Sequence, residues 1–191
     1  FLGLALGLAL SASARIELHS LFGDNMILQR NTNNSLWGWV QPGAAVEVNA
    51  SWGVTARTKA DEKGKWVVLL NTPGPGTGHG LTISSGKEVV QIKNVAVGEV
   101  WLCAGQSNMG FALGMMFTGE EEAPKAKHPN YRIFKSSREH WHEPRERSND
   151  RLAMWKPCTP QSASESSALS YYFAQKLHLE LGIPVGIIIQ A

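Results

Sequence analysis

Residues 97–110 read VGEVWLCAGQSNMG, and this stretch decides the class of fold. Its first eight residues are mostly apolar and end just before Gly105, a pattern typical of a strand buried on both faces of a parallel sheet. Ser107 follows at the expected carboxyl end of that strand, where open α/β sheets place their active sites. A small residue at position 105 allows a sharp turn. The Ser107 hydroxyl can then project above the sheet edge, with its backbone N–H free to face an oxyanion.

The residues after this stretch continue an α/β pattern. Residues 131–134 predict a second strand, and apolar residues at helical spacing across 167–181, followed by Gly182, predict a helix with a glycine stop. The apolar run 185–189 predicts another strand. The order strand, helix, strand indicates a parallel α/β layer, whereas residues 118–165 predict mainly loop with short elements.

The residues before position 97 alternate between apolar and polar with a period of two. Short alternating runs occur at 45–50, 65–70 and 89–92, and turn-forming residues separate them at 41–43, 61–64 and 73–80. Alternation with a period of two, and no helical period, predicts an antiparallel β-sandwich. We therefore expect two domains, a β-sandwich over 15–95 and an α/β domain over 96–191.

Both ends of the chain carry apolar runs. Residues 1–10 are uncharged and apolar, and this run is about half as long as the ~20 apolar residues that span a bilayer. The Ala-x-Ala spacing that follows suits cleavage by a signal peptidase after Ala14. Residues 1–14 therefore predict an incomplete signal peptide rather than a stable membrane anchor. This implies an exported protein, whether secreted, lysosomal or periplasmic. Residues 185–191 have no turn or polar cap after them, so we expect a fragment that lacks the C-terminal part of its α/β domain.

The composition narrows the possible partners. The chain has 191 residues, with 18 Lys plus Arg and 16 Asp plus Glu, so its formal charge of +2 gives no reason to expect a nucleic acid partner. Its two cysteines, Cys103 and Cys158, cannot form a multi-bridge framework or a four-thiolate zinc site. We therefore expect no structural metal.

Two commoner motifs do not fit the serine turn. A phosphate-binding loop requires Lys where the chain has Phe111, and the α/β-hydrolase elbow requires Gly where the chain has Met109. On local chemistry alone, a serine such as Ser107 is more often a helix N-cap than a nucleophile.

The segment 98–109, GEVWLCAGQSNM, resembles the nucleophile block of the sialate O-acetylesterases within the SGNH hydrolase superfamily. Residues 21–30, LFGDNMILQR, with Trp37-Gly38 and Pro42-Gly43, resemble that family's N-terminal β region, and residues 171–188 resemble its helix and next strand. The resemblance spans nearly all of residues 15–191. It implies a flavodoxin-like SGNH hydrolase domain after the β-sandwich, and hydrolysis of O-acetyl groups on sialic acid by a reaction that requires no metal or cofactor.

The resemblance also implies roles for particular residues. Ser107 would be the nucleophile of an acyl-enzyme mechanism, and its backbone N–H one oxyanion donor, in a turn supported by Gly105, Gln106 and Asn108. The family's other oxyanion donors and its Asp-x-x-His pair lie far enough downstream to fall beyond Ala191. The chain alone should therefore be inactive.

Several histidines and one acidic cluster have competing interpretations. No histidine lies in an Asp-x-x-His pattern; the six are His19, His79, His128, His140, His142 and His178. The segment Glu139-His140-Trp141-His142-Glu143 would place two imidazoles on one face of a strand, as in a metal site, but the surrounding Arg and Glu residues favour a solvated loop.

Aromatic and sulfur-containing residues also have two interpretations. The tryptophans at positions 37, 39, 52 and 66 suit a sugar-stacking platform, although core packing is favoured. Cys103 is predicted to be an inert buried thiol, and whether it pairs with Cys158 stays open. Asn33 and Asn49 begin N-glycosylation sequons.

These observations predict an exported serine carbohydrate esterase that acts on O-acetylated sialic acid or another acetylated sugar. One alternative is an esterase of acetylated plant polysaccharide such as xylan. The other is a non-catalytic carbohydrate-binding module in which Ser107 caps a helix.

Overall fold

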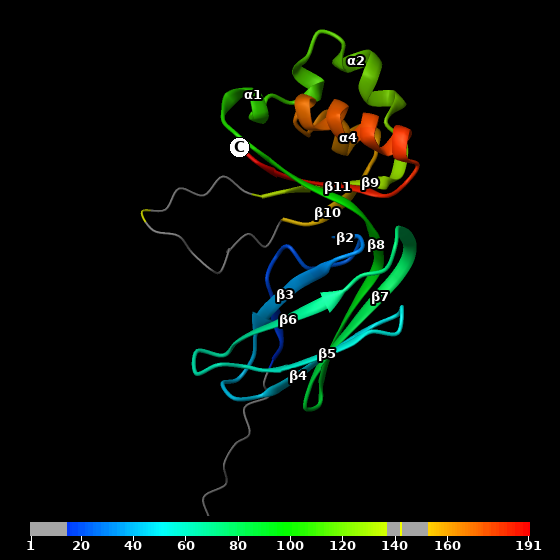
Figure 1. The fold of residues 1–191 in the computed structure, drawn as a ribbon. Coiled ribbons are helices and arrows are strands. Elements are labelled where there is room, and N and C mark those ends of the chain that lie inside the picture. Colours follow the sequence, from blue (N-terminus) through cyan, green and yellow to red (C-terminus); the bar gives the residue numbers. More distant parts are fainter. Residues whose placement is uncertain (1–14, 137–141, 143–152) are drawn as a thin grey trace, which may run out of the picture.

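The computed structural model describes residues 15–136, 142 and 153–191 as a mixed α/β fold (Figure 1). The strands are β1 (Glu17–Leu18), β2 (Ile27–Gln29), β3 (Asn33–Trp39), β4 (Ala45–Ala50), β5 (Thr55–Lys59), β6 (Lys65–Asn71), β7 (Gly76–Ser85), β8 (Glu88–Ala104), β9 (His128–Lys135), β10 (Trp155–Cys158) and β11 (Val185–Gln190). The helices are α1 (Ser107–Gly110), α2 (Gly119–Glu122), α3 (Pro160–Ser164) and α4 (Ala168–Leu181), with 3-10 turns at Leu113–Met115 and Ala123–Lys125. All the described helices follow β8, which confirms that the region before residue 95 is strand rather than helix.

Two sheets form the N-terminal region and share one core. One sheet has the order β1-β3-β6, and the other contains β5, β4, β7 and the first half of β8. The sequence alternation explains the burial: in β6, Trp66, Val68 and Leu70 are buried while Val67 and Leu69 are exposed. The buried side chains of both sheets belong to a single hydrophobic cluster.

β8 is 17 residues long and belongs to both parts of the molecule. Its first half pairs antiparallel with β7, and Glu99–Ala104 pairs in parallel with β11. Gly98 lies where the strand changes partner, and a Cβ added there would lie 2.0 Å from the carbonyl oxygen of Pro184. Only glycine allows this close approach. The domain boundary expected at residues 95–96 therefore falls inside a continuous strand.

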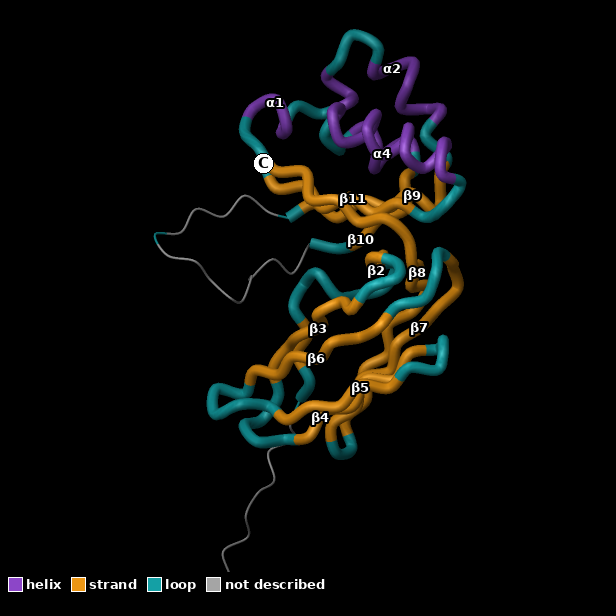
Figure 2. The backbone as a smooth tube through the Cα atoms, in the orientation of Figure 1, coloured by secondary structure: helices purple, strands orange, loops and turns teal. Residues whose placement is uncertain are grey.

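β9, β11 and the end of β8 form a parallel sheet, with β10 antiparallel to β9 at its edge. α4 covers one face of this sheet (Figure 2). The Ser167 hydroxyl caps its start, and Gly182, with φ of 65°, ends it. The predictions of a helix over 167–181 and of strands at 131–134 and 185–189 are therefore confirmed. β10 was not predicted, because it is short and contains Pro157, which only an edge strand tolerates.

One expectation about β8 is not met within the described residues. Its segment 97–104 was predicted to be buried on both faces, yet Trp101 is 44% and Leu102 67% exposed. Among the described residues, Val97 and Gly98 pair with β2 and Glu99–Ala104 pairs with β11 alone, whereas β11 pairs on both sides and buries Val185 and Ile187 completely. An apolar run alone does not show on how many sides a strand is paired.

Arg132 on β9 connects the parallel sheet to the N-terminal region. Its side chain is buried, and burial lowers the pKa of its guanidinium. The guanidinium donates hydrogen bonds to the backbone carbonyls of Asn25, Met26 and Asn94. Asn25 and Asn94 have left-handed backbones, with φ of 66° and 54°, and their side chains are hydrogen-bonded to each other at 2.7 Å. These two turns therefore direct carbonyl oxygens at one buried cation.

The predicted signal peptide over 1–14 lies outside the described residues. Within the described part of the chain, no helix has the length and apolar character needed to cross a membrane.

Candidate active site

Ser107 lies at the carboxyl end of β8 and is exposed. It is the first residue of α1, whose N-cap is Gln106, and no side chain caps this helix. Among the described residues, the Ser107 hydroxyl has no hydrogen-bond partner. The hydroxyl therefore does not serve as a helix cap here and remains available to an incoming group.

Gly105 is explained by a close contact rather than by a special backbone angle. A Cβ at this position would lie 3.0 Å from the Cβ of Met109. The Gly105 N–H donates to the carbonyl of Gln190 at 3.0 Å, which joins the turn to the end of β11. The turn thus stays tight because β8 and α1 nearly touch.

The far side of the turn is anchored to α4. The Sδ atom of Met109 accepts hydrogen bonds from the hydroxyls of Ser167 and Ser170, at 3.3 and 3.2 Å. Sequence reasoning missed these two serines, because their S-x-x-S spacing signals only a helix start. They position the turn without contacting the serine itself.

The backbone of the turn leaves the predicted oxyanion donor free. The Gly110 N–H donates to the carbonyl of Gln106 at 2.8 Å and closes the turn. Within the described residues, the Ser107 N–H makes no backbone hydrogen bond. Gln106 and Asn108 are exposed beside it. The arrangement offers a hydroxyl and an N–H at one accessible position.

No described histidine is hydrogen-bonded to Ser107. His19 contacts the rings of Phe22 and Trp37, and burial lowers its pKa. His128 and His178 pair with each other, with ring centroids 5.7 Å apart, and His178 bonds the carbonyl of Ile183.

The segment 139–143, for which a metal site is the alternative to a solvated loop, lies outside the described residues except for His142, which is exposed. In the remaining described chain, no three His, Cys, Asp or Glu side chains are grouped as metal ligands would be.

The tryptophans and cysteines follow the interpretations based on packing. Trp39 and Trp66 are buried, and Trp37 and Trp52 pack against the hydrophobic cluster that contains Trp66, which confirms the core interpretation. Both cysteines are buried and free. The strand order puts β10 three strands from β8, about 14 Å at ~4.8 Å per strand, which is too far for a disulfide.

Both sequon asparagines lie at the ends of described strands. Asn33 is exposed, and its Oδ1 accepts a hydrogen bond from Asn71. The Asn49 amide donates to Glu47 at 2.7 Å and its Oδ1 accepts from Thr55 at 2.6 Å. Asn49 is therefore already engaged in the sheet surface.

No protein-family model matches the chain. The chain is 26% identical to sialate O-acetylesterase of Mus musculus over 93% of this chain and 36% of that protein. It is 27% identical to sialate O-acetylesterase of Homo sapiens over 97% of this chain and 40% of that protein. The crystal structure of a carbohydrate acetylesterase from Xanthomonas citri matches with a TM-score of 0.84 and 34% identity, covering 91% of this chain and 39% of that one.

These similarities include the N-terminal sheets, the serine turn and the parallel sheet, because each covers more than nine-tenths of the chain. The chain spans less than half the length of these relatives. The chain is thus a homologue of the sialate O-acetylesterases over most of its length, as the motif at 98–109 predicts.

Proposed function

We propose that this chain carries the nucleophile of a serine carbohydrate esterase that removes O-acetyl groups, preferentially from sialic acids. The observation that carries the proposal is the placement of Ser107 at the carboxyl end of a parallel strand, where its side chain is exposed and its hydroxyl does not cap the following helix. Homology to sialate O-acetylesterases and to a carbohydrate acetylesterase supports this chemistry. In this proposal, residues 15–95 form an antiparallel β-sandwich and residues 96–191 the first half of a flavodoxin-like SGNH domain, in an exported protein.

The reaction is an acyl transfer in two steps. Ser107 Oγ attacks the acetyl carbonyl carbon while a histidine takes its proton, and the resulting oxyanion accepts a hydrogen bond from the Ser107 N–H. Collapse breaks the ester C–O bond, the histidine returns the proton to the sugar oxygen, and the acetyl group stays on Ser107. Water, deprotonated by the same histidine, then attacks the acyl carbon; the bond from that carbon to Ser107 Oγ breaks, the histidine returns the proton to Oγ, and acetate leaves.

The general base and its acidic partner belong to the whole protein beyond Ala191 in this proposal. A serine without a base is a weak nucleophile at neutral pH, and each missing oxyanion donor lowers the rate by about 10²–10³. The isolated chain should therefore release no acetate from 4-nitrophenyl acetate above background. Release that Ser107→Ala abolishes in this chain would show that the base lies within it.

The substrate is tested on the whole protein. We expect it to deacetylate 9-O-acetyl sialic acid faster than acetylated xylan, and Ser107→Ala to remove the activity while leaving the fold intact. Faster deacetylation of xylan than of sialic acid would overturn the preferred substrate and identify a polysaccharide acetylesterase instead. Glycan binding without turnover, unchanged by Ser107→Ala, would favour a carbohydrate-binding module instead.

A further inference from the structure

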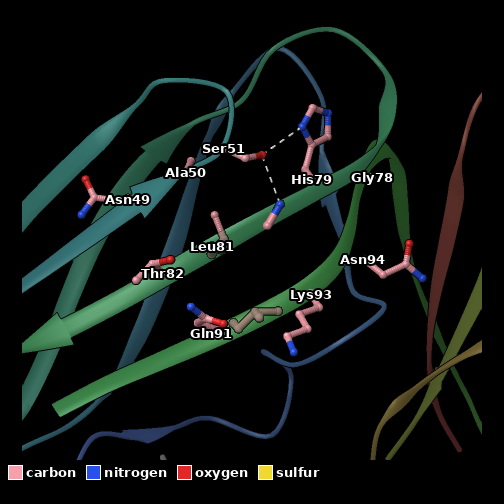
Figure 3. Close-up of a pocket in the computed structure, with 12 residues that line it drawn as sticks. Asn49, Ala50, Ser51, Gly78, His79, Leu81, Thr82, Gln91, Lys93 and Asn94 are labelled. Atoms are coloured by element: carbon pink, nitrogen blue, oxygen red, sulfur yellow. Dashed lines mark hydrogen bonds between the residues drawn. The ribbon is translucent and has the colours of Figure 1, made fainter.

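A groove of about 400 Å³ lies on the N-terminal region and is lined by residues of β4, β7 and β8 and of the turn after β4 (Figure 3). Its floor is a row of side chains on three neighbouring strands, since Asn49 pairs with Thr82 and Thr82 with Gln91. Residues that pair directly lie on the same face of a sheet. The row is therefore a continuous polar strip across β4, β7 and β8.

An irregularity in β7 shapes the groove. The pairing of β7 with β8 shifts register between Gly76 and His79, and again between His79 and Leu81. Gly78, inside the first irregularity, has φ of 75° and open space where a Cβ would be. Bulges of this kind separate the strands locally and re-aim side chains, and His79 lines the groove beside this irregularity.

His79 forms a fixed wall at one end. The Ser51 hydroxyl lies 3.4 Å from its Nδ1 and accepts the Gly80 N–H at 3.1 Å, as the dashed lines in Figure 3 mark. The Trp52 ring packs against the imidazole edge to face, with centroids 5.2 Å apart. The imidazole is therefore held in place before any ligand arrives.

The floor and the Lys93 side of the groove offer polar groups without partners. Within the described chain, the side chains of Thr82, Gln91 and Lys93 have no hydrogen bond or ion pair. Lys93 is the charged residue among those that line the groove. Two carboxylates lie close by, but both are engaged. Asp24 accepts the Lys93 backbone N–H at 2.7 Å, and Glu47 is paired with Arg57 at 2.6 Å.

We propose that this groove binds a carboxylate-bearing sugar unit of a glycan. The Lys93 ammonium pairs with the sugar carboxylate, Gln91 and Thr82 hydrogen-bond its hydroxyls, and the His79 imidazole borders its ring. Lys93 and the end of β8 are separated by 11 residues, up to ~36 Å of strand at ~3.3 Å per residue. This second site would hold a polymeric glycan on the protein and raise the local concentration of its ester groups.

The test compares two sugars that differ only at C6. D-Galacturonate and D-galactose are titrated into the whole ¹⁵N-labelled chain, and amide shifts are followed by NMR. We expect galacturonate to shift the amides of Gly80, Gln91 and Lys93, and galactose to shift them far less. Equal responses to the two sugars, or no response to galacturonate, would overturn the proposal.

Matched variants locate the contact. Lys93→Gln should weaken galacturonate binding about tenfold, because it removes one charge-assisted hydrogen bond. Lys87→Gln, an exposed lysine at the opposite end of the same hairpin, is the control and should leave binding unchanged. Neither sugar carries an ester, so Ser107→Ala should also bind normally, and this result separates the groove from the proposed esterase. Binding that survives Lys93→Gln intact would refute the assignment.

Discussion

Replacing Arg132 with methionine should lower the free energy of unfolding by about 2–4 kcal/mol. The substitution leaves the carbonyls of Asn25 and Asn94 without their donor, whereas the Met26 carbonyl keeps the Ala96 N–H at 3.0 Å. An orphaned buried carbonyl costs about 1–3 kcal/mol, so two cost about 2–6. Asn94 is exposed, so water reaches its carbonyl and the lower half of that range applies.

Urea denaturation, followed by tryptophan fluorescence and circular dichroism, measures this loss. Arg57→Met is the matched control, because Arg57 forms an exposed ion pair with Glu47 and its side chain is 73% exposed. That variant should lose less than about 1 kcal/mol. Arg132→Lys keeps the charge but not the fork of donors, and should fall between the two. If Arg132→Met were no less stable than Arg57→Met, the guanidinium would not join the two regions as described.

Three further outcomes are expected. Gly98→Ala should lower the free energy of unfolding by about 2 kcal/mol or more in the same urea titration, because its Cβ would meet the Pro184 carbonyl oxygen. Gly23→Ala, where a Cβ meets open space, should leave that free energy unchanged, and equal losses in the two variants would contradict the Gly98 contact. Burial lowers the pKa of His19 and His128 below 6.5, so the unfolded chain binds more protons than the folded chain and the free energy of unfolding should fall as pH drops below about 6.5. His128→Asn should flatten this dependence of stability on pH, and an unchanged dependence would exclude a contribution from His128. Burial raises the pKa of Cys158 to about 12, so in a Cys103→Ala variant a disulfide reagent at about pH 8 should label Cys158 only after unfolding. Rapid labelling of that native variant would refute the burial of Cys158.

The serine turn shows how much of the candidate site can be predicted from local sequence. The apolar run, the glycine and the serine predict a strand, a turn and an exposed hydroxyl, and the structure has all three. The structure adds the reason for a small residue at position 105, because a Cβ there would lie 3.0 Å from the Cβ of Met109 in the same turn. Ser107 as the nucleophile stays a prediction that the whole protein must test.

The amino-acid sequence by itself determined the elements whose signals are local. Period-two runs specified the strands of the N-terminal region, and Ser167 and Gly182 bounded α4, because alternation and capping depend on neighbouring residues only. Tertiary structure alone decided which strands pair. It made β8 continuous through residue 98, exposed Trp101 and Leu102, separated the two cysteines, and aimed two asparagine carbonyls at Arg132. These features depend on contacts between residues far apart in the chain, which no local pattern records.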